Sequence, residues 1–354
     1  MNRLINSYIL YILPAAAWVI SFNACSPAVT FEPPVNDPLV VDAGTDGQLN
    51  ILTYNIQTVF GKDESKLDAL LQYINNAGFD FVLLQELFDE NARNYILENI
   101  DRQHYQSVVS RVDYESFPDN LFQDSGLFLM SKYPQVDLTV IDHDDDVEVT
   151  EGAIHLMLNK ELSVSTDFLA NKSVMGSLHR LDDSTFVFMF TTHLQALGSR
   201  SHKRRQFRQI KNFIDYATYT VIEAGLVKSP ENLVVLLTGD FNSDAYDEED
   251  LDNLTTFLGS PRDLHMEYNP SGIEYTMMFK LFNLYKRFDY IFAYDEVMQI
   301  PLKKVRTRSI NVTDIKNRTN DSISDHLALK ASLIIDAKSG VAFEDLTDTE
   351  QYGK

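Results

Sequence analysis

The sequence of 354 residues is short of cysteine and of basic side chains. It holds one cysteine, Cys25, so neither an intramolecular disulfide nor a thiolate zinc site can form. Lysine and arginine number 30 against 52 aspartates and glutamates, which gives a formal net charge of -22. A chain this acidic repels polyanions, so we expect no stable nucleic-acid partner, although a local basic patch or a bound cation could still admit a phosphate. With 44% hydrophobic and 23% charged residues, the composition excludes a disordered or collagen-like protein.

The N-terminus has the pattern of an export signal. Arg3 precedes an uncharged run over residues 4–24 with a dense apolar centre, which predicts a signal peptide over residues 1–24. The sole cysteine follows in Phe-Asn-Ala-Cys, which resembles the lipidation motif of bacterial lipoproteins, although its Phe and Asn depart from that motif. We expect an exported protein, either an outer-membrane or cell-surface lipoprotein lipidated on Cys25 or a secreted one. A plain secretory signal with a chance cysteine, or an uncleaved anchor, would give the same pattern.

The rest of the chain divides into three parts. Residues 25–47 are rich in Pro, Asp and Gly without periodicity, which predicts a tether, and residues 337–354 form an acidic tail. Between them, apolar runs of strand length alternate with helical patterns, so residues 48–336 are expected to form one domain. We predict strands over 49–55, 81–87, 126–131, 185–193, 233–240, 289–294 and 327–335, and helices over 66–78 and 201–219. The strand runs are almost continuously apolar, as when both faces are covered. The acidic stretches 141–148 and 244–252 are interpreted as solvated loops.

Polar side chains stand at the ends of these strands. Asp240 and Asn242 close one strand, and because positions two apart face the same way they can address one site. Oxygen and amide ligands without thiolates suit a hard cation such as Mg²⁺. Two histidines suit acid and base catalysis near neutral pH, so these are the parts for metal-assisted attack of water on a phosphate ester. Each piece alone is also explained by a solvated strand end or a turn. The full set is Asn55, Glu86, His193, Asp240, Asn242, Asp289, Asp325 and His326.

In chain order these segments resemble the endonuclease/exonuclease/phosphatase superfamily, which has the deoxyribonuclease-I-like fold, over residues 49–335. The resemblance implies a fold of class α/β (α+β), a four-layer sandwich of two mixed β-sheets flanked by helices. It also implies a phosphodiesterase or phosphomonoesterase that depends on Mg²⁺, for which Mn²⁺ or Co²⁺ can substitute. By this similarity Asn55 and Glu86 belong to the metal side, and Asp325 supports the metal or the water.

The same resemblance assigns the remaining roles. His326 is the general base, and Asp289 is the carboxylate that orients it. Asp240 and Asn242 orient the phosphate and the attacking water. His193 binds the phosphate or protonates the leaving oxygen.

A narrower resemblance is to the neutral sphingomyelinases. Glu-Leu-Phe-Asp at 86–89, the segment 167–172 that ends in Lys172, and His-Leu-Gln-Ala at 193–196 with the basic helix after it are similar to segments of that family. Lys172 would then contact the phosphate, although Ser173 stands where the family usually has glycine. Secreted bacterial members carry an aromatic-tipped hairpin in the interval 303–323, which here has no aromatic residue. The apolar stretch 275–282 could contact lipid but is interpreted as core.

The resemblance implies C-type hydrolysis of sphingomyelin, a phospholipid, to ceramide and phosphocholine at a membrane surface by a monomer. Two alternatives share the fold, an exported nuclease and a phosphatase of phosphoinositides or inositol phosphates. A third is a non-enzymatic surface lipoprotein. It predicts lost ligands, whereas no core position of the motif is missing.

Overall fold

The computed structural model describes residues 47–58, 62–113, 124–141, 143, 146–161, 170–279 and 284–336. The predicted signal peptide, Cys25, nearly all of the tether and the acidic tail lie outside these residues and stay predictions. Within the described ranges, no helix combines the length and the apolar character that crossing a membrane requires.

A six-stranded sheet forms one half of the domain, in the order β17-β18-β1-β2-β4-β3. Its two central strands, β1 and β2, run parallel, and every other neighbouring pair runs antiparallel. The strands are β1 (Gln48–Thr58), β2 (Phe81–Leu87), β3 (Ser107–Val109), β4 (Phe128–Ser131), β17 (Val305–Thr313) and β18 (Ala328–Ile335).

A second sheet has the order β11-β14-β10-β9-β8-β7-β6, with β5 paired to β8. Its central strands, β9 and β10, run parallel and place His193 opposite Asp240, while antiparallel β14 places Asp289 on the other side of Asp240. The strands are β5 (Gln135–Val136), β6 (Val147–Thr150), β7 (Ala153–Met157), β8 (Ser173–Arg180), β9 (Phe186–His193), β10 (Leu233–Asp240), β11 (Arg262–Asp263) and β14 (Asp289–Tyr294).

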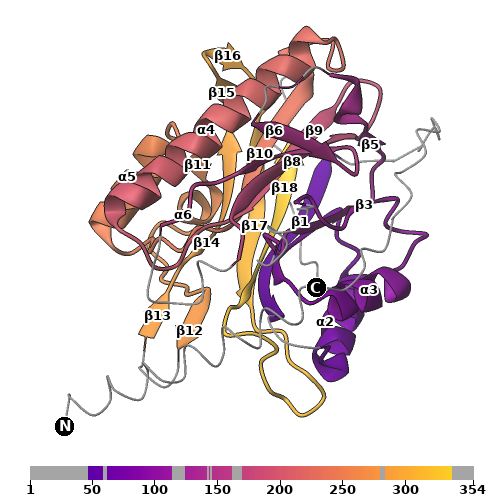
Figure 1. Cartoon of the computed structure of the whole chain (residues 1–354), viewed down its shortest axis with the longest axis vertical. Coiled ribbons are helices and arrows are strands. Elements are labelled where there is room, and N and C mark those ends of the chain that lie inside the picture. The colour runs from indigo at the N-terminus through magenta and orange to yellow at the C-terminus, as the bar shows by residue number, and fades with distance from the viewer. Residues whose placement is uncertain are drawn as a thin grey trace, which may run out of the picture.

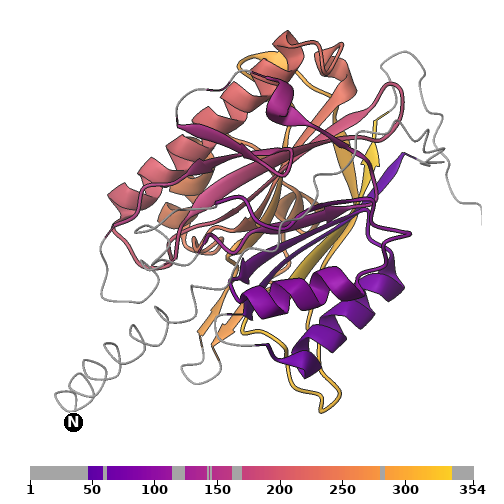
Figure 2. The same ribbon diagram turned by 45° about the vertical axis from the view of Figure 1, so that its right-hand side comes forward.

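The two sheets pack face to face, with helices on both outer sides (Figures 1 and 2). Along β1, Leu49 and Ile51 enter the core between the sheets, and Leu52 and Tyr54 enter the core beneath the helices. This alternation explains why the strands are apolar throughout and confirms the four-layer sandwich. The helices are α2 (Glu64–Ala77) and α3 (Glu90–Asn99) on the first sheet, α4 (Arg200–Glu223) on the second, and α5 (Glu248–Phe257) and α6 (Leu264–Tyr268) beside it.

The interpretation of the acidic stretches as solvated loops was wrong for most of the second stretch, and for the first only at its last two residues. Part of the first forms β6, and most of the second begins α5, where the side chain of Asp247 caps the helix by accepting from the backbone N–H of Asp250. Acidic residues in a first turn favour a helix through its dipole. Glu249 then pairs with Arg200 of α4 at 2.8 Å. Arg200 and Arg204 on the basic side of α4 therefore face α5.

The interpretation of residues 275–282 as core holds for Thr276, which is fully buried, but not for the two methionines after it. Met277 and Met278 lie half-buried in β12 (Met277–Phe279), which pairs with β13 (Leu284–Lys286) as a separate two-stranded hairpin (Figure 1). A second such pair is β15 (Glu296–Val297) with β16 (Ile300–Pro301). The interval 303–323 contains β17, which pairs along β18.

The strand that carries Asp240 approaches its neighbour so closely that only glycine fits before the acid. Gly239 has a φ of +127°, and a Cβ there would lie 2.0 Å from the carbonyl oxygen of Thr192. We expect Gly239→Ala to lower the free energy of unfolding by about 3 kcal/mol, because the two backbones must separate. Gly225→Ala is the control, since its φ is +73° but nothing lies within 4 Å of the added Cβ, and it should cost about 1 kcal/mol. Urea denaturation measures both, and equal losses would contradict the packing described here.

Candidate active site

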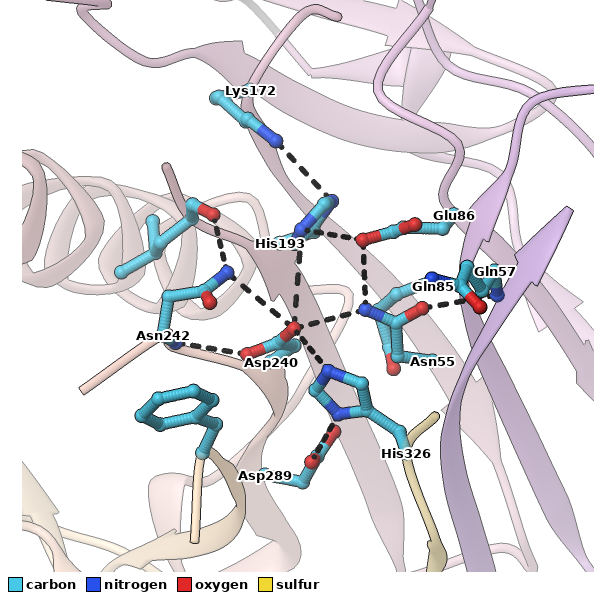
Figure 3. Close-up of polar contacts among 12 residues, drawn as sticks. Asn55, Gln57, Gln85, Glu86, Lys172, His193, Asp240, Asn242, Asp289 and His326 are labelled. Carbon is cyan, nitrogen blue, oxygen red and sulfur yellow. Dashed lines mark hydrogen bonds and ion pairs between the residues drawn. The ribbon is translucent and has the colours of Figure 1, made fainter. Parts of the chain in front are cut away.

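The predicted strand-end residues gather where the carboxyl ends of the central parallel strands of both sheets meet (Figure 3). The register of β9, β10 and β14 sets His193, Asp240 and Asp289 side by side. From the other sheet, Nδ2 of Asn55 reaches Oδ2 of Asp240 at 2.9 Å and Oε1 of Glu86 at 3.0 Å. Asn55 thus joins carboxylates from the two sheets.

Asp240 is a buried carboxylate, with 1% of its surface exposed. Its Oδ1 accepts from the backbone N–H of Asn242 at 2.9 Å, while Oδ2 faces Asn55 and both histidines. Burial raises the pKa of Asp240 to about 7, with Asp289 adding to the rise and His326 opposing it. A positive charge placed beside this carboxylate would offset the cost of burying it.

Three of the strand ends turn through the left-handed region, which non-glycine residues rarely adopt. Gln57, Glu86 and Asn242 have φ values of 48°, 55° and 48°. Such conformations cost free energy and persist where the surroundings hold them. At Glu86 the turn brings Oε1 to 3.4 Å from Nε2 of His193, and burial raises the pKa of the carboxyl.

His326 lies between two carboxylates. Its Nδ1 lies 2.8 Å from Oδ2 of Asp289, which leaves Nε2 directed at Asp240 at 3.6 Å. Burial alone would lower the pKa of His326, but the negative charges of Asp289 and Asp240 outweigh it and raise the value to about 10. The carboxylates around the ring thus favour a protonated His326 unless another cation compensates them.

His193 is the opposite case. Burial, followed by the charges of Lys172 and His326, holds its pKa well below the usual value, so the ring is neutral. Nζ of the buried Lys172 lies 3.5 Å from Nδ1, which makes that nitrogen the acceptor. The ring proton then sits on Nε2, pointing at Glu86 and Asp240. A neutral ring with this tautomer can donate a hydrogen bond to an anion.

The remaining predicted residues lie around this centre. Nδ2 of Asn242 donates to the carbonyl oxygen of Leu194 at 2.9 Å, and Nζ of Lys203 donates to the carbonyl oxygen of Asn242. Asp325 lies at the rim, where Oδ2 accepts from Nε2 of Gln57 at 3.0 Å. Every strand-end residue predicted from the sequence is thus in or beside one cluster.

Two glutamines of the cluster were missed by the sequence analysis. The backbone N–H of Gln57 donates to Oδ1 of Asn55 at 3.1 Å. Gln57 lies two positions after Asn55, so the same-face rule that selected Asn242 could have found it. Gln85 is fully buried, and its Nε2 donates to Thr53 at 3.1 Å and to Thr191 of the other sheet at 3.2 Å. Its signal was a polar side chain inside an apolar strand.

Two overlapping groups of side chains in the described part could hold a metal ion, Glu86 with His193 and Asp240, and Asp240 with Asp289 and His326. The first suits a hard divalent cation, because carboxylate oxygens converge in a place where burial penalises their charge. As Asn55 is oriented, its amide donates to both carboxylates and its oxygen accepts from Gln57, so it orients the carboxylates. Direct coordination by its oxygen requires the amide to turn over.

Comparisons with known proteins agree with this geometry. The model of the Endonuclease/Exonuclease/phosphatase family matches residues 52–326. An uncharacterized protein of Dictyostelium discoideum is 21% identical over 261 residues, which cover 67% of this chain. The chain spans about a fifth (21%) of the length of that relative.

Solved structures share the fold at low sequence identity. TDP2 of D. rerio complexed with a single-strand DNA product has a TM-score of 0.56 at 14% identity, over 81% of this chain and 99% of that one. Sphingomyelinase C from Streptomyces griseocarneus has a TM-score of 0.51 at 18% identity, over 80% and 99%. At these identities the likeness shows the fold.

The pairing of His326 with Asp289 predicts a pH dependence for protein kept in chelator. A pKa raised from 6.5 to about 10 means that the ion pair stabilises the fold fully below pH 6.5 and that this stabilisation is lost as the pH rises through about 10. Asp289→Asn removes the nearest negative charge, so the imidazole pKa should fall and the variant should be less stable than wild type at neutral pH. NMR titration of the ring and urea denaturation test this. An unchanged imidazole pKa in Asp289→Asn would contradict it.

Proposed function

The chain belongs to the endonuclease/exonuclease/phosphatase family, and on that basis we propose that it is a metal-dependent phosphodiesterase that hydrolyses sphingomyelin to ceramide and phosphocholine. The observation that carries the hydrolytic part is the geometry of His326, with one ring nitrogen held by Asp289 and the other directed at Asp240. The choice of sphingomyelin is supported by Lys172, which the sphingomyelinase resemblance selected and which lies beside His193.

In the proposed reaction, Nε2 of His326 takes a proton from a water molecule, whose oxygen attacks phosphorus. The carboxylate of Asp289 stabilises the resulting imidazolium and keeps the ring in place. The bond from phosphorus to the ceramide oxygen breaks, and that oxygen takes up a proton from water, while His326 returns its proton to solvent. Phosphocholine and ceramide are the products.

The remaining residues of the cluster act on the phosphate. Lys172 supplies a positive charge, and the Nε2–H group of His193 can donate a hydrogen bond to a phosphate oxygen or to the leaving oxygen. A divalent cation held by Glu86 and Asp240 would neutralise phosphate charge and, by compensating the carboxylates, lower the pKa of His326 toward neutral pH. We propose Mg²⁺ for this cation, with Mn²⁺ or Co²⁺ able to replace it.

The substrate would be reached at a lipid surface by an exported monomer, which we propose is secreted or anchored through Cys25. The hairpin of β12 and β13 supports contact with lipid, because it lies next to Asp325 and His326. The backbone N–H of Met278 donates to the carbonyl oxygen of Asp325 at 2.9 Å, and the side chain of Tyr285 is 39% exposed. An apolar hairpin next to the base would place the site at the membrane.

The substrate class is tested by release of phosphocholine from sphingomyelin in detergent micelles. We expect release that depends on Mg²⁺, stops with chelator and falls at least about 1,000-fold in His326→Ala, because the base is lost. Release from folded His326→Ala near the wild-type rate would contradict the assignment of the base. Absence of release by folded wild type, together with nicking of supercoiled DNA or release of phosphate from phosphoinositides, would replace sphingomyelin by that substrate.

The role of Lys172 is tested by Lys172→Met, which keeps most of the side-chain volume. We expect kcat/KM to fall about 100-fold, because a buried positive charge beside the phosphate is removed. Lys228→Met is a matched control, since Lys228 is exposed beyond the far end of α4, about 35 Å along the helix from its start near the site. Equal kinetics of the two variants would rule out a phosphate contact.

A further inference from the structure

A guanidinium is buried behind the metal side of the site. Arg93 of α3 is 2% exposed, which is unusual for a charged side chain. Its Nη2 donates to the carbonyl oxygen of Leu87 at 2.6 Å and to Oδ2 of Asp124 at 2.8 Å, and its Nη1 donates to Glu90 at 2.7 Å. Leu87 directly follows Glu86, so Arg93 holds the peptide at the carboxyl end of β2.

Asp124 holds the other side of the same strand end. Its Oδ1 accepts from the backbone N–H of Gly126 at 2.7 Å, and the carbonyl oxygen of Gly126 accepts from the N–H of Leu87 at 3.0 Å. Both backbone groups of Leu87 are therefore tied to the pair of Arg93 and Asp124. These hydrogen bonds hold the residue that follows the left-handed backbone of Glu86, while the hydroxyl of Thr58 donates to the carbonyl oxygen of Glu86 at 3.0 Å.

A second arm runs from the same segment to the phosphate side. Asp113 is buried, and its carboxylate accepts from the backbone N–H of Ser125 at 2.8 Å and from its hydroxyl at 3.1 Å. It also accepts from the side chain of Asn171, the residue before Lys172. The short run 124–126 thus links the strand end of Glu86 to the segment that carries Lys172.

We propose that Arg93, Asp113 and Asp124, called here the buried network, are positioning residues that set the metal-side Glu86 and the phosphate-side Lys172 relative to each other. The proposal rests on the proposed function for the roles of Glu86 and Lys172. Burying a charged group costs free energy, and such a group holds its partners only in a narrow geometry. Arg93 and Asp124 should therefore control the position of Glu86, and Asp113 the position of Lys172. Residues that support metal ligands in this way commonly change metal affinity 10- to 100-fold when replaced.

The experiment replaces Arg93 and Asp113 separately in the full chain and measures the affinity of each variant for Mn²⁺ and for inorganic phosphate. Arg93→Lys keeps the charge but loses the planar fork, so the Kd for Mn²⁺, measured by electron paramagnetic resonance, should rise about tenfold. Asp113→Asn replaces a carboxyl group whose two oxygens both accept from Ser125 with an amide whose NH₂ cannot accept. It should leave the Mn²⁺ affinity within about twofold of wild type and weaken inhibition by inorganic phosphate, at saturating Mn²⁺, about tenfold.

A matched control separates positioning from general loss of stability. Arg262 also bonds two carboxylates and one carbonyl oxygen, those of Glu267, Asp295 and Val305, but none of these belongs to the site. Arg262→Met should lower stability and leave the affinities for both probes unchanged. If Arg93→Lys does not fold, Gly126→Ala approaches the same strand end, since its Cβ would lie 3.0 Å from Cα of Glu86, and the same loss of Mn²⁺ affinity is expected.

The outcomes divide cleanly. Loss of Mn²⁺ affinity through Arg93 and of phosphate affinity through Asp113, with Arg262→Met unchanged, supports the proposal. The proposal is overturned if Arg93→Lys and Asp113→Asn both keep wild-type affinities for Mn²⁺ and phosphate. It is also overturned if either variant loses affinity for Mn²⁺ and for phosphate to the same extent. If wild type binds no Mn²⁺, the proposed function fails, and the network is then decided by the backbone carbon chemical shifts of Glu86, which must change in Arg93→Lys and stay constant in Arg262→Met.

Discussion

The buried carboxylate of Asp240 ties the two sheets together at the site and sets the charge of its neighbours. It accepts from Asn55 of the first sheet, and Asp289 of the second lies beside it in register. Taking a carboxylate out of water costs several kcal/mol unless donors or cations surround it. N–H groups of Asn55 and Asn242 and the rings of two histidines surround the carboxylate of Asp240. The need to compensate its buried charge therefore shapes both the contact between the sheets and the charges of the site.

From this constraint the two histidines acquire different states. His326 lies between two carboxylates, which raise its pKa, whereas His193 is buried against Lys172, which lowers its pKa. One ring is thereby held protonated unless a cation compensates the carboxylates, and the other is suited to donate a hydrogen bond as a neutral group. Sequence position alone would not separate them, because each lies at a strand boundary.

Much of the fold could be predicted from the sequence, because strands buried on both faces are apolar throughout. The predicted bounds of β2, β10 and β14 agree with the structure to the residue. Among the strands that were not predicted, β3 is short, and β8 and β17 carry polar side chains inside strands. The helix α5 was missed because a run of acids was taken for a solvated surface, although Arg200 of α4 pairs with Glu249 in it.

The strand-end residues of the site were predicted from the sequence, whereas the buried network behind them was missed. The carboxyl ends of neighbouring parallel strands lie side by side, so polar residues at these ends can be expected to lie in one site. Arg93 and Asp124 are 31 positions apart and make their contact only after α3 has packed against β2 and the segment before β4. Nothing in local pattern or periodicity marks such a pair, and the same is true of Asp113 and Asn171.

We propose that Glu86 and Asp240 hold a divalent cation beside His326. Anomalous diffraction at the manganese edge, from crystals soaked in Mn²⁺, would locate this cation. We expect an anomalous peak between the carboxylates of Glu86 and Asp240 that is absent from crystals of Glu86→Gln soaked in the same way. A peak elsewhere, or no peak between these carboxylates in wild-type crystals, would contradict it.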